Sequence, residues 1–220
     1  MNRLPTLTLP LSAPSEETAN QITHGLGCLL SVIGADLLVR TAWQTGDSRR
    51  IVGCIVYAAS LVLLYAASTL SHSFSAPRLR DWFRTLDQVC IFLMMAGSFT
   101  PFALAYLWND TWSWLLAVMW GMALVGIGLK LFVQRTENVS VLFYVLVGCL
   151  PFVAIWPMIQ LVTGVGLTWI LAGGAAYLIG VGFYVRDESL RYGHAVWHVC
   201  VIAGSVCHFM FMLDFVAKTI

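Results

Sequence analysis

Long apolar runs separated by short polar connections make up nearly the whole chain. A helix that crosses a bilayer needs about 20 mostly apolar residues, and the sequence offers seven segments of that kind. We expect them at residues 22–42, 51–72, 86–107, 112–133, 139–161, 165–185 and 194–217. The pattern predicts an all-α integral membrane protein, a bundle of seven transmembrane helices. Residues 1–15 would form a short N-terminal tail and residues 16–220 the transmembrane domain.

Prolines interrupt two of these segments. Pro101 lies in the third, and Pro151 and Pro157 lie in the fifth. Proline removes a backbone donor and kinks a helix, and membrane helices tolerate this where neighbouring groups satisfy the freed carbonyls. We therefore expect bends at these positions that shape the bundle.

Basic residues in the connections indicate the orientation, because cytoplasmic loops of membrane proteins are enriched in lysine and arginine. With the N-terminus inside, eight basic residues are cytoplasmic: Arg3, Arg78, Arg80, Arg84, Lys130, Arg135, Arg186 and Arg191. Four lie outside: Arg40, Arg49, Arg50 and Lys218. The balance predicts a cytoplasmic N-terminus and an external C-terminus, although three of the four external residues flank the first outer loop.

Composition narrows the class of protein further. Hydrophobic residues make up 59% of the 220 residues and charged residues only 10%, against about 25% charged in a soluble domain. The net charge is +1 and the basic residues form no patch, so we expect no nucleic-acid partner. The six cysteines lie in apolar segments without a C-x-x-C pair, which favours buried thiols over disulfides or a thiolate metal site.

Ionisable residues inside membrane spans are costly and usually face the interior of the bundle. In the predicted topology, odd-numbered spans begin at the face where even-numbered spans end. His24 opens the first span, His72 closes the second, Asp87 opens the third, and His194 and His198 open the seventh. The parity of the crossings therefore places these five residues at one membrane face.

The spacing of the histidines indicates a metal site. His194 and His198 are four residues apart and share one helix face, and Ser68 and His72 repeat that offset. Three histidines with a fourth position open to water are a catalytic zinc arrangement. Asp87 could orient a ligand or hydrogen-bond the water. An H-x-x-x-H pair also fits two helix-packing histidines, and three imidazoles also suit copper, nickel or iron.

The other polar residues in the spans have simpler interpretations. His208 lies deeper in the last span and is expected to be a hydrogen-bonded core histidine. Asp36 and Asp214 are interpreted as polar contacts within the bundle, with an ion path as the alternative. Glu17 and Asn20 precede the first predicted span, where capping of the helix N-terminus is the simplest role.

The polar residues also form an ordered set of motifs: Glu17-x2-Asn20-x3-His24-Gly25, Ser68-x3-His72, Asp87, Ser98-Phe99-Thr100-Pro101 and His194-x3-His198. This set resembles the hemolysin III family of bacterial inner-membrane proteins, which belongs with the progestin and adiponectin receptors. The resemblance runs from about Glu16 to the C-terminus. One difference is Phe99, where the family more often has a tyrosine, so one hydroxyl contact is missing here.

The resemblance implies a seven-helix bundle with its N-terminus inside and a zinc ion near the cytoplasmic face. The zinc ligands of the adiponectin receptors match His72, His194 and His198. The family aspartate and serine match Asp87 and Ser68, which would be catalytic. The remaining motif residues would support the site: Glu17, Asn20 and His24.

Three functions are compatible with this pattern. The first is a zinc-dependent hydrolase of lipid amides that acts in membrane-lipid homeostasis, as the receptors' link to ceramide hydrolysis implies. The second is a regulator or sensor of membrane lipids with structural zinc, and the third is a hemolysin-like pore former. The expected partners are membrane lipids, including a fatty-acid or lipid-amide ligand in the bundle. The short N-terminus offers no domain for a protein hormone. The expected location is the bacterial inner membrane.

Overall fold

The computed structural model describes residues 14–132 and 137–218, and every regular element among them is helical. In chain order they are α1 (Pro14–Gln44), α2 (Ser48–Ser71), α3 (Pro77–Phe102), η1 (Ala103–Leu107), α4 (Trp114–Phe132), α5 (Glu137–Cys149), η2 (Leu150–Ala154), α6 (Ile155–Leu161), α7 (Gly164–Tyr184), α8 (Gly193–Phe211) and η3 (Met212–Val216). Seven helical spans in this part of the chain are long and apolar enough to cross a membrane, since η1, η2 and η3 each continue a neighbouring helix. The predicted all-α bundle of seven spans is confirmed.

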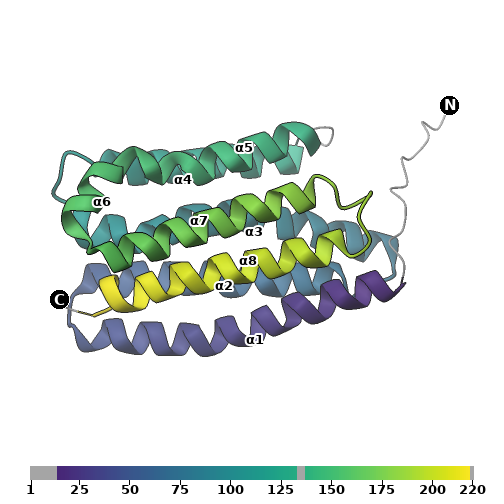
Figure 1. Ribbon diagram of the computed structural model, residues 1–220, viewed down its shortest axis with the longest axis horizontal. Helices are drawn as coiled ribbons and strands as arrows, with labels where there is room; N and C mark the ends of the chain where they lie inside the picture. The colour runs from purple at the N-terminus through teal and green to yellow at the C-terminus, as the bar shows by residue number, and fades with distance from the viewer. Residues whose placement is uncertain (1–13, 133–136, 219–220) are drawn as a thin grey trace.

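The helices lie side by side along the long axis of the molecule (Figure 1). The helices α1, α2 and α8 are neighbours on one side, and α4 and α5 lie on the opposite side. The chain enters α1 at one end of the bundle and leaves η3 at the other. The end where α1 starts is also the end where α2 stops and where α3 and α8 start, so these four helix ends meet.

Two of the three irregular helical turns adjoin predicted prolines, whereas η3 contains none and Pro157 lies within the regular helix α6. The π-helical turn η1 begins two residues after Pro101, where the N–H of Ala103 reaches the carbonyls of both Phe99 and Thr100. The 3-10 turn η2 contains Pro151 and separates α5 from α6. In both places the proline lacks the N–H that an α-helix would use, and the backbone adopts another helical register.

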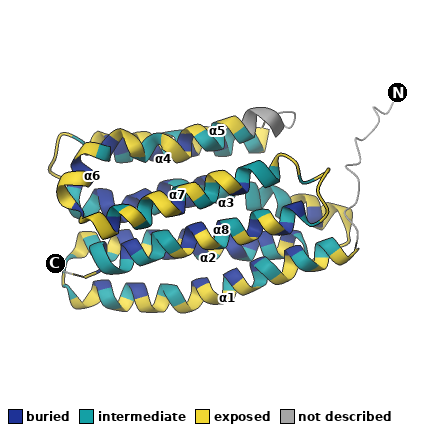
Figure 2. Ribbon diagram, viewed as in Figure 1, coloured by how far each residue is buried: buried dark blue, intermediate teal, exposed yellow. Residues whose placement is uncertain are grey.

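The surface of the bundle is apolar where a soluble protein would be polar. In α1 the side chains of Ile22, Leu29 and Ile33 are 59–64% exposed, and exposed residues alternate along the outer face of the helix (Figure 2). Such a surface is stable only against lipid. The interior holds large side chains, including Tyr57 and Phe102, that are at most 1% exposed.

Helices α2 and α3 pack closely against each other near the start of α2. A Cβ atom at Gly53 would lie only 2.6 Å from the Cα atom of Pro101, so glycine permits this backbone contact. The N-terminus of α2 is fixed by Asp47, whose carboxylate accepts a hydrogen bond of 2.9 Å from the N–H of Arg49. This cap satisfies one of the backbone donors that an α-helix leaves free at its start.

Two helices begin earlier than predicted. Helix α1 begins at Pro14 rather than near residue 22, and α3 begins at Pro77 rather than near residue 86. Hydropathy detects the segment that lies in the hydrocarbon, whereas helical geometry continues into the polar region, and Pro77 provides the fixed φ angle that suits a first turn. Glu17 and Asn20 therefore lie within α1 instead of preceding it. Residues 1–13 of the predicted tail lie outside the described residues.

The interpretation of Asp36 as an interior contact is wrong. Its carboxylate pairs with Arg40 at 2.7 Å on the outside of α1, where the two side chains are 62% and 77% exposed. Asp214 pairs with Lys218 at 2.6 Å near the end of the chain. His208 is confirmed as a hydrogen-bonded core histidine, with its Nε2 atom 3.4 Å from the carbonyl of Ile170.

Candidate metal centre

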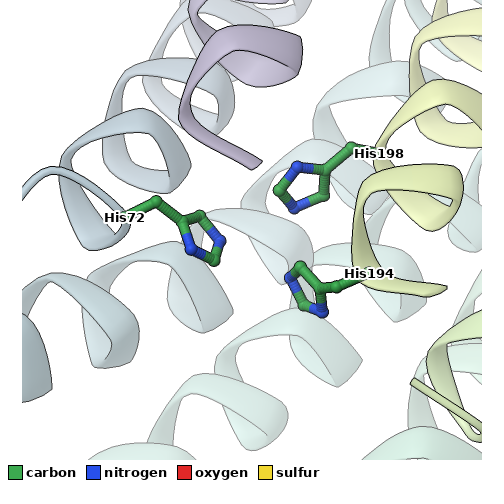
Figure 3. A group of neighbouring side chains, drawn as sticks. All are labelled: His72, His194 and His198. Atoms are coloured by element: carbon green, nitrogen blue, oxygen red, sulfur yellow. The ribbon is translucent and has the colours of Figure 1, made fainter. Parts of the chain in front are cut away.

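The predicted site residues gather where four helix ends meet. His72 is the residue that ends α2, and His194 and His198 lie on the first two turns of α8. One ring nitrogen of each histidine lies within 4.8 Å of the other two. Figure 3 shows the three rings around a common space, with one nitrogen of each directed into it. This is the convergence that the parity of the crossings predicted.

The donor set and its spacing fit a metal ion. All three donors are imidazole nitrogens, which suit zinc and other first-row transition metals. Nitrogens that each lie about 2.1 Å from one ion are at most about 4.2 Å apart. Separations of up to 4.8 Å therefore require only a small inward rotation of the rings.

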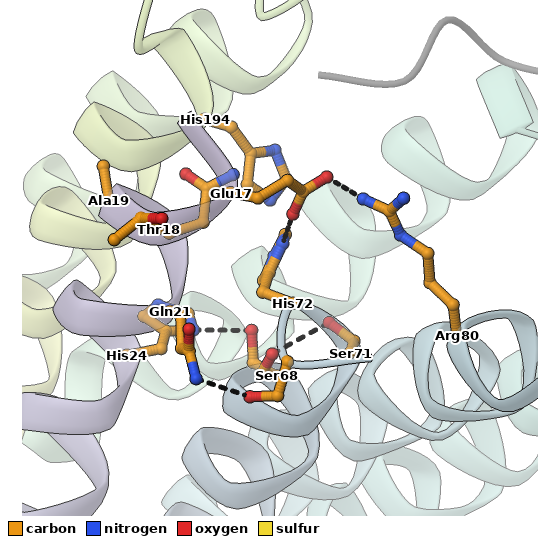
Figure 4. A network of polar contacts seen from close by, with 12 residues as sticks. Glu17, Thr18, Ala19, Gln21, His24, Ser68, Ser71, His72, Arg80 and His194 are labelled. Carbon is orange, nitrogen blue, oxygen red and sulfur yellow. Dashed lines mark hydrogen bonds and ion pairs between the residues drawn. The ribbon is translucent and has the colours of Figure 1, made fainter. Parts of the chain in front are cut away.

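An ion-pair network holds the outer side of His72. Its Nδ1 atom lies 2.7 Å from Oε2 of Glu17, and the other carboxylate oxygen of Glu17 accepts from Nη2 of Arg80 (Figure 4). These three side chains come from α2, α1 and α3, and all are largely buried, with exposed fractions of 8%, 17% and 10%. A carboxylate on Nδ1 keeps the proton there, which leaves the Nε2 lone pair for a metal.

The other two histidines are held in the same way. The Nδ1 atom of His194 lies 2.9 Å from Oδ2 of Asp187, in the connection between α7 and α8. The Nδ1 atom of His198 lies 3.1 Å from the hydroxyl of Thr23 and 3.3 Å from the carbonyl of Asn20, both on α1. In each histidine an oxygen occupies Nδ1, so it is Nε2 that faces the common space.

The charge state of His72 agrees with a role as ligand. His72 lies just beyond the last residue of the second span. Burial first, and then the neighbouring His194 and Arg84, lower the pKa of His72 to about 3. The imidazole is therefore neutral at physiological pH, as a metal ligand must be.

His24, Ser68 and Asp87 form a second row beside the three histidines. The Nδ1 atom of His24 lies 2.6 Å from the Ser68 hydroxyl, and the carboxyl group of Asp87 interacts with both Ser68 and His194. The His24 ring stacks on His198 with 3.5 Å between the ring centroids. The structure thus brings the predicted catalytic and supporting residues against the histidine cluster.

Two buried polar atoms of α1 beside the histidines have no hydrogen-bond partner among the described residues. They are Oδ1 of Asn20 and Nε2 of His24, and both side chains are only 3% exposed. An unsatisfied buried polar atom costs about 1–3 kcal/mol. A water molecule or a polar group of a ligand would remove that cost, so α1 offers two further contacts for a molecule bound at the site.

Sequence reasoning missed three of the partners. Thr23 and Arg80 were not associated with the site, and Asp187 was not considered. The parity argument could have included Asp187, because the connection between the last two spans lies at the same membrane face as His194 and is short. Nothing in the sequence pattern distinguishes Arg80 from its basic neighbours, because its partner Glu17 lies 63 residues away.

Comparisons with known proteins agree with the architecture. The profile of a family described as haemolysin-III related matches residues 12–209. The chain is 40% identical over 205 residues to Hemolysin-3 of Bacillus cereus, covering 93% of each protein. It is 35% identical over 204 residues to the Hemolysin-3 homolog of Bacillus subtilis, covering 92% of this chain and 95% of the homolog. The human monocyte to macrophage differentiation factor is 26% identical over 200 residues, or 88% of this chain and 82% of that protein.

Proposed function

The chain belongs to the haemolysin-III related family, and we propose that it is a zinc-dependent hydrolase of lipid amides in the bacterial inner membrane. The observation that carries this proposal is the arrangement of His72, His194 and His198. Each offers one nitrogen to a common space and has an oxygen atom on Nδ1. Packing alone does not require three imidazoles whose Nδ1 atoms all contact oxygen atoms and whose other nitrogens face one another.

The ion would be held by these three histidines, and it would supply a Lewis acid that polarises a carbonyl oxygen and lowers the pKa of a water molecule. Asp87 lies beside Ser68 and His194, where its carboxylate would accept a proton from the attacking water and return it to the leaving amine. The Ser68 hydroxyl would orient that water or stabilise the charge that develops on the carbonyl oxygen.

The substrate would enter from the lipid phase. The site lies at the end of an apolar bundle, so an acyl chain can remain among apolar side chains while its polar head reaches the histidines. The amide N–H or a hydroxyl of the head would donate to Oδ1 of Asn20, and Nε2 of His24 would bind a second polar atom. Both protein atoms are buried and lack a partner among the described residues. The distribution of basic residues supports a cytoplasmic position for this end of the bundle.

Pore formation is the alternative that the name of the Bacillus cereus relative, Hemolysin-3, suggests. Asp36 pairs with Arg40 on the lipid-facing side of α1, so it does not line a polar path through the interior. A regulator with structural zinc would use the same ligands but would show no turnover.

The test is hydrolysis by the purified protein in lipid nanodiscs with zinc, using a panel of lipid amides and esters and mass spectrometry of the released fatty acid. We expect release from at least one amide and a loss of at least 100-fold in His198→Ala. The control is His208→Gln, which changes a half-buried histidine of the same helix outside the cluster and keeps a hydrogen-bond donor. No release from any lipid by the zinc-loaded protein would contradict the proposed hydrolase.

A further inference from the structure

Asp187 stands apart from the other site residues because it lies neither within a helix nor at a helix cap, but in the connection between α7 and α8. The connection between α7 and α8 folds back over the start of α8, and the Asp187 carboxylate reaches Nδ1 of His194 at 2.9 Å. The two side chains are equally exposed, 28% each. This is the most exposed of the three histidine–oxygen contacts. It ties the connection between α7 and α8 to the first turn of α8.

The backbone of the connection is built to bring Asp187 to this position. A Cβ atom at Gly193 would lie 3.0 Å from the Cα atom of Asp187, so glycine allows the connection to lie against the first turn of α8. Tyr192 adopts a left-handed conformation with a φ of 59°, which is unfavourable for a bulky residue. The carboxylate of Glu16 in α1 accepts the Tyr192 N–H at 3.1 Å and helps to hold the turn.

A strained residue, a close backbone contact and a carboxylate–imidazole contact thus converge on one histidine. Strain of this kind persists only where the surroundings determine the conformation. The connection therefore places a carboxylate on Nδ1 of His194, just as Glu17 places one on Nδ1 of His72. His198, in contrast, has a hydroxyl and a carbonyl on that nitrogen.

We propose that Asp187 is a positioning residue of the metal centre, which fixes the tautomer and ring orientation of His194 and strengthens Nε2 as a donor to the ion. This inference rests on the proposed metal site. A carboxylate that accepts Nδ1–H makes the imidazole a better ligand, and the loss of such a partner typically costs about 10–100-fold in metal affinity. The connection between α7 and α8 is therefore part of the site rather than a passive link.

The experiment measures zinc affinity of the full-length protein in detergent by competition with a chromophoric chelator. Asp187→Ala should bind zinc about 10–100-fold more weakly than the wild type. Asp187→Asn keeps an oxygen acceptor and should lie between the two. The matched control is Glu188→Gln, which removes a neighbouring exposed carboxylate and should leave the affinity within about twofold of the wild type.

Two further measurements separate positioning from a general structural role. The visible spectrum of the cobalt-substituted protein should change in Asp187→Ala and not in Glu188→Gln. Only Asp187→Ala removes the hydrogen-bond partner that orients His194. Gly193→Ala should also weaken zinc binding, since its methyl group pushes the Asp187 backbone away from His194.

The outcomes distinguish this inference from the metal site itself. If the wild type binds zinc tightly and Asp187→Ala binds it equally well, the positioning role is wrong and the metal site stands. The role is also wrong if Asp187→Ala only lowers the melting temperature of the metal-free protein. Failure of the wild type to bind any transition metal would overturn the proposed site and this inference together.

Discussion

The ion pair between Glu17 and Arg80 joins α1 to α3, and the same carboxylate contacts His72 at the end of α2, so the loss of one partner should be strongly destabilising. Glu17→Gln removes the charge that both Arg80 and His72 use, yet keeps one oxygen as an acceptor. The Glu17 and Arg80 side chains are only 17% and 10% exposed. Loss of one partner of a buried pair costs about 3–5 kcal/mol. Because the glutamine keeps one acceptor oxygen and the pair is partly exposed, we expect Glu17→Gln to lower the free energy of unfolding by about 2–3 kcal/mol.

A double-mutant cycle isolates the pair. The free energy of unfolding would be measured by denaturant titration in mixed micelles, with metal removed, for the wild type, Glu17→Gln, Arg80→Gln and the double variant. Because the removal of both partners leaves no uncompensated charge, the double variant should be more stable than the sum of the two single effects by about 1–3 kcal/mol.

The control for this cycle is Asp36→Asn. It makes the same chemical change in the same helix, but at an exposed pair with Arg40, and it should change stability by less than about 0.5 kcal/mol. Strict additivity of the Glu17 and Arg80 effects, or a Glu17→Gln effect no larger than that of the control, would refute the reasoning.

Three further predictions concern the mechanism, the packing and the pH dependence. Asp87→Asn should lower hydrolysis by at least about 100-fold while zinc content stays the same, and a parallel loss of zinc would contradict a proton-transfer role. Gly53→Ala should destabilise the protein by about 1–3 kcal/mol, because its Cβ would meet Pro101, whereas Gly121→Ala has open space and should be nearly neutral in thermal unfolding. The pKa of His72 is lowered from 6.5 to about 3 in the folded protein. Between these two pH values the unfolded chain binds a proton at His72 and the folded protein does not, so acid favours unfolding. The metal-free protein should therefore lose stability between pH 7 and pH 4, with a smaller loss in His72→Gln, and an identical pH profile for both would contradict the shift.

The sequence was sufficient to predict the number of spans and the convergence of the three histidines. Both follow from strong signals, namely long apolar runs and the parity of their crossings, which sets the depth of His72 relative to His198 without any knowledge of helix packing. Two prolines likewise predicted where helices depart from α geometry, because a missing N–H is a local property, but the π turn η3 has no proline and was not predicted. Pro101 and Pro151 show the effect in two different forms, a π turn and a 3-10 turn.

The parts that could not be predicted depend on rotation and on polar helix ends. The depth of Asp36 in α1 was evident, but the direction of its side chain is set by which face of α1 packs on α2 and α8, and that face carries no strong periodic signal. The early starts of α1 and α3 were missed because hydropathy does not detect a helix outside the hydrocarbon. Glu17 and Arg80 lie in the first turns of α1 and α3, which the hydropathy pattern did not predict. Their contact therefore became evident only in the structure.

The central claim is that three histidines from α2 and α8 hold one metal ion. Its most direct test is elemental analysis of the purified full-length protein beside His72→Ala and the control His208→Gln, each expressed and purified identically. We predict about one zinc per chain in the wild type and in the control, and a loss of that zinc in His72→Ala. Equal metal content in wild type and His72→Ala would contradict the claim.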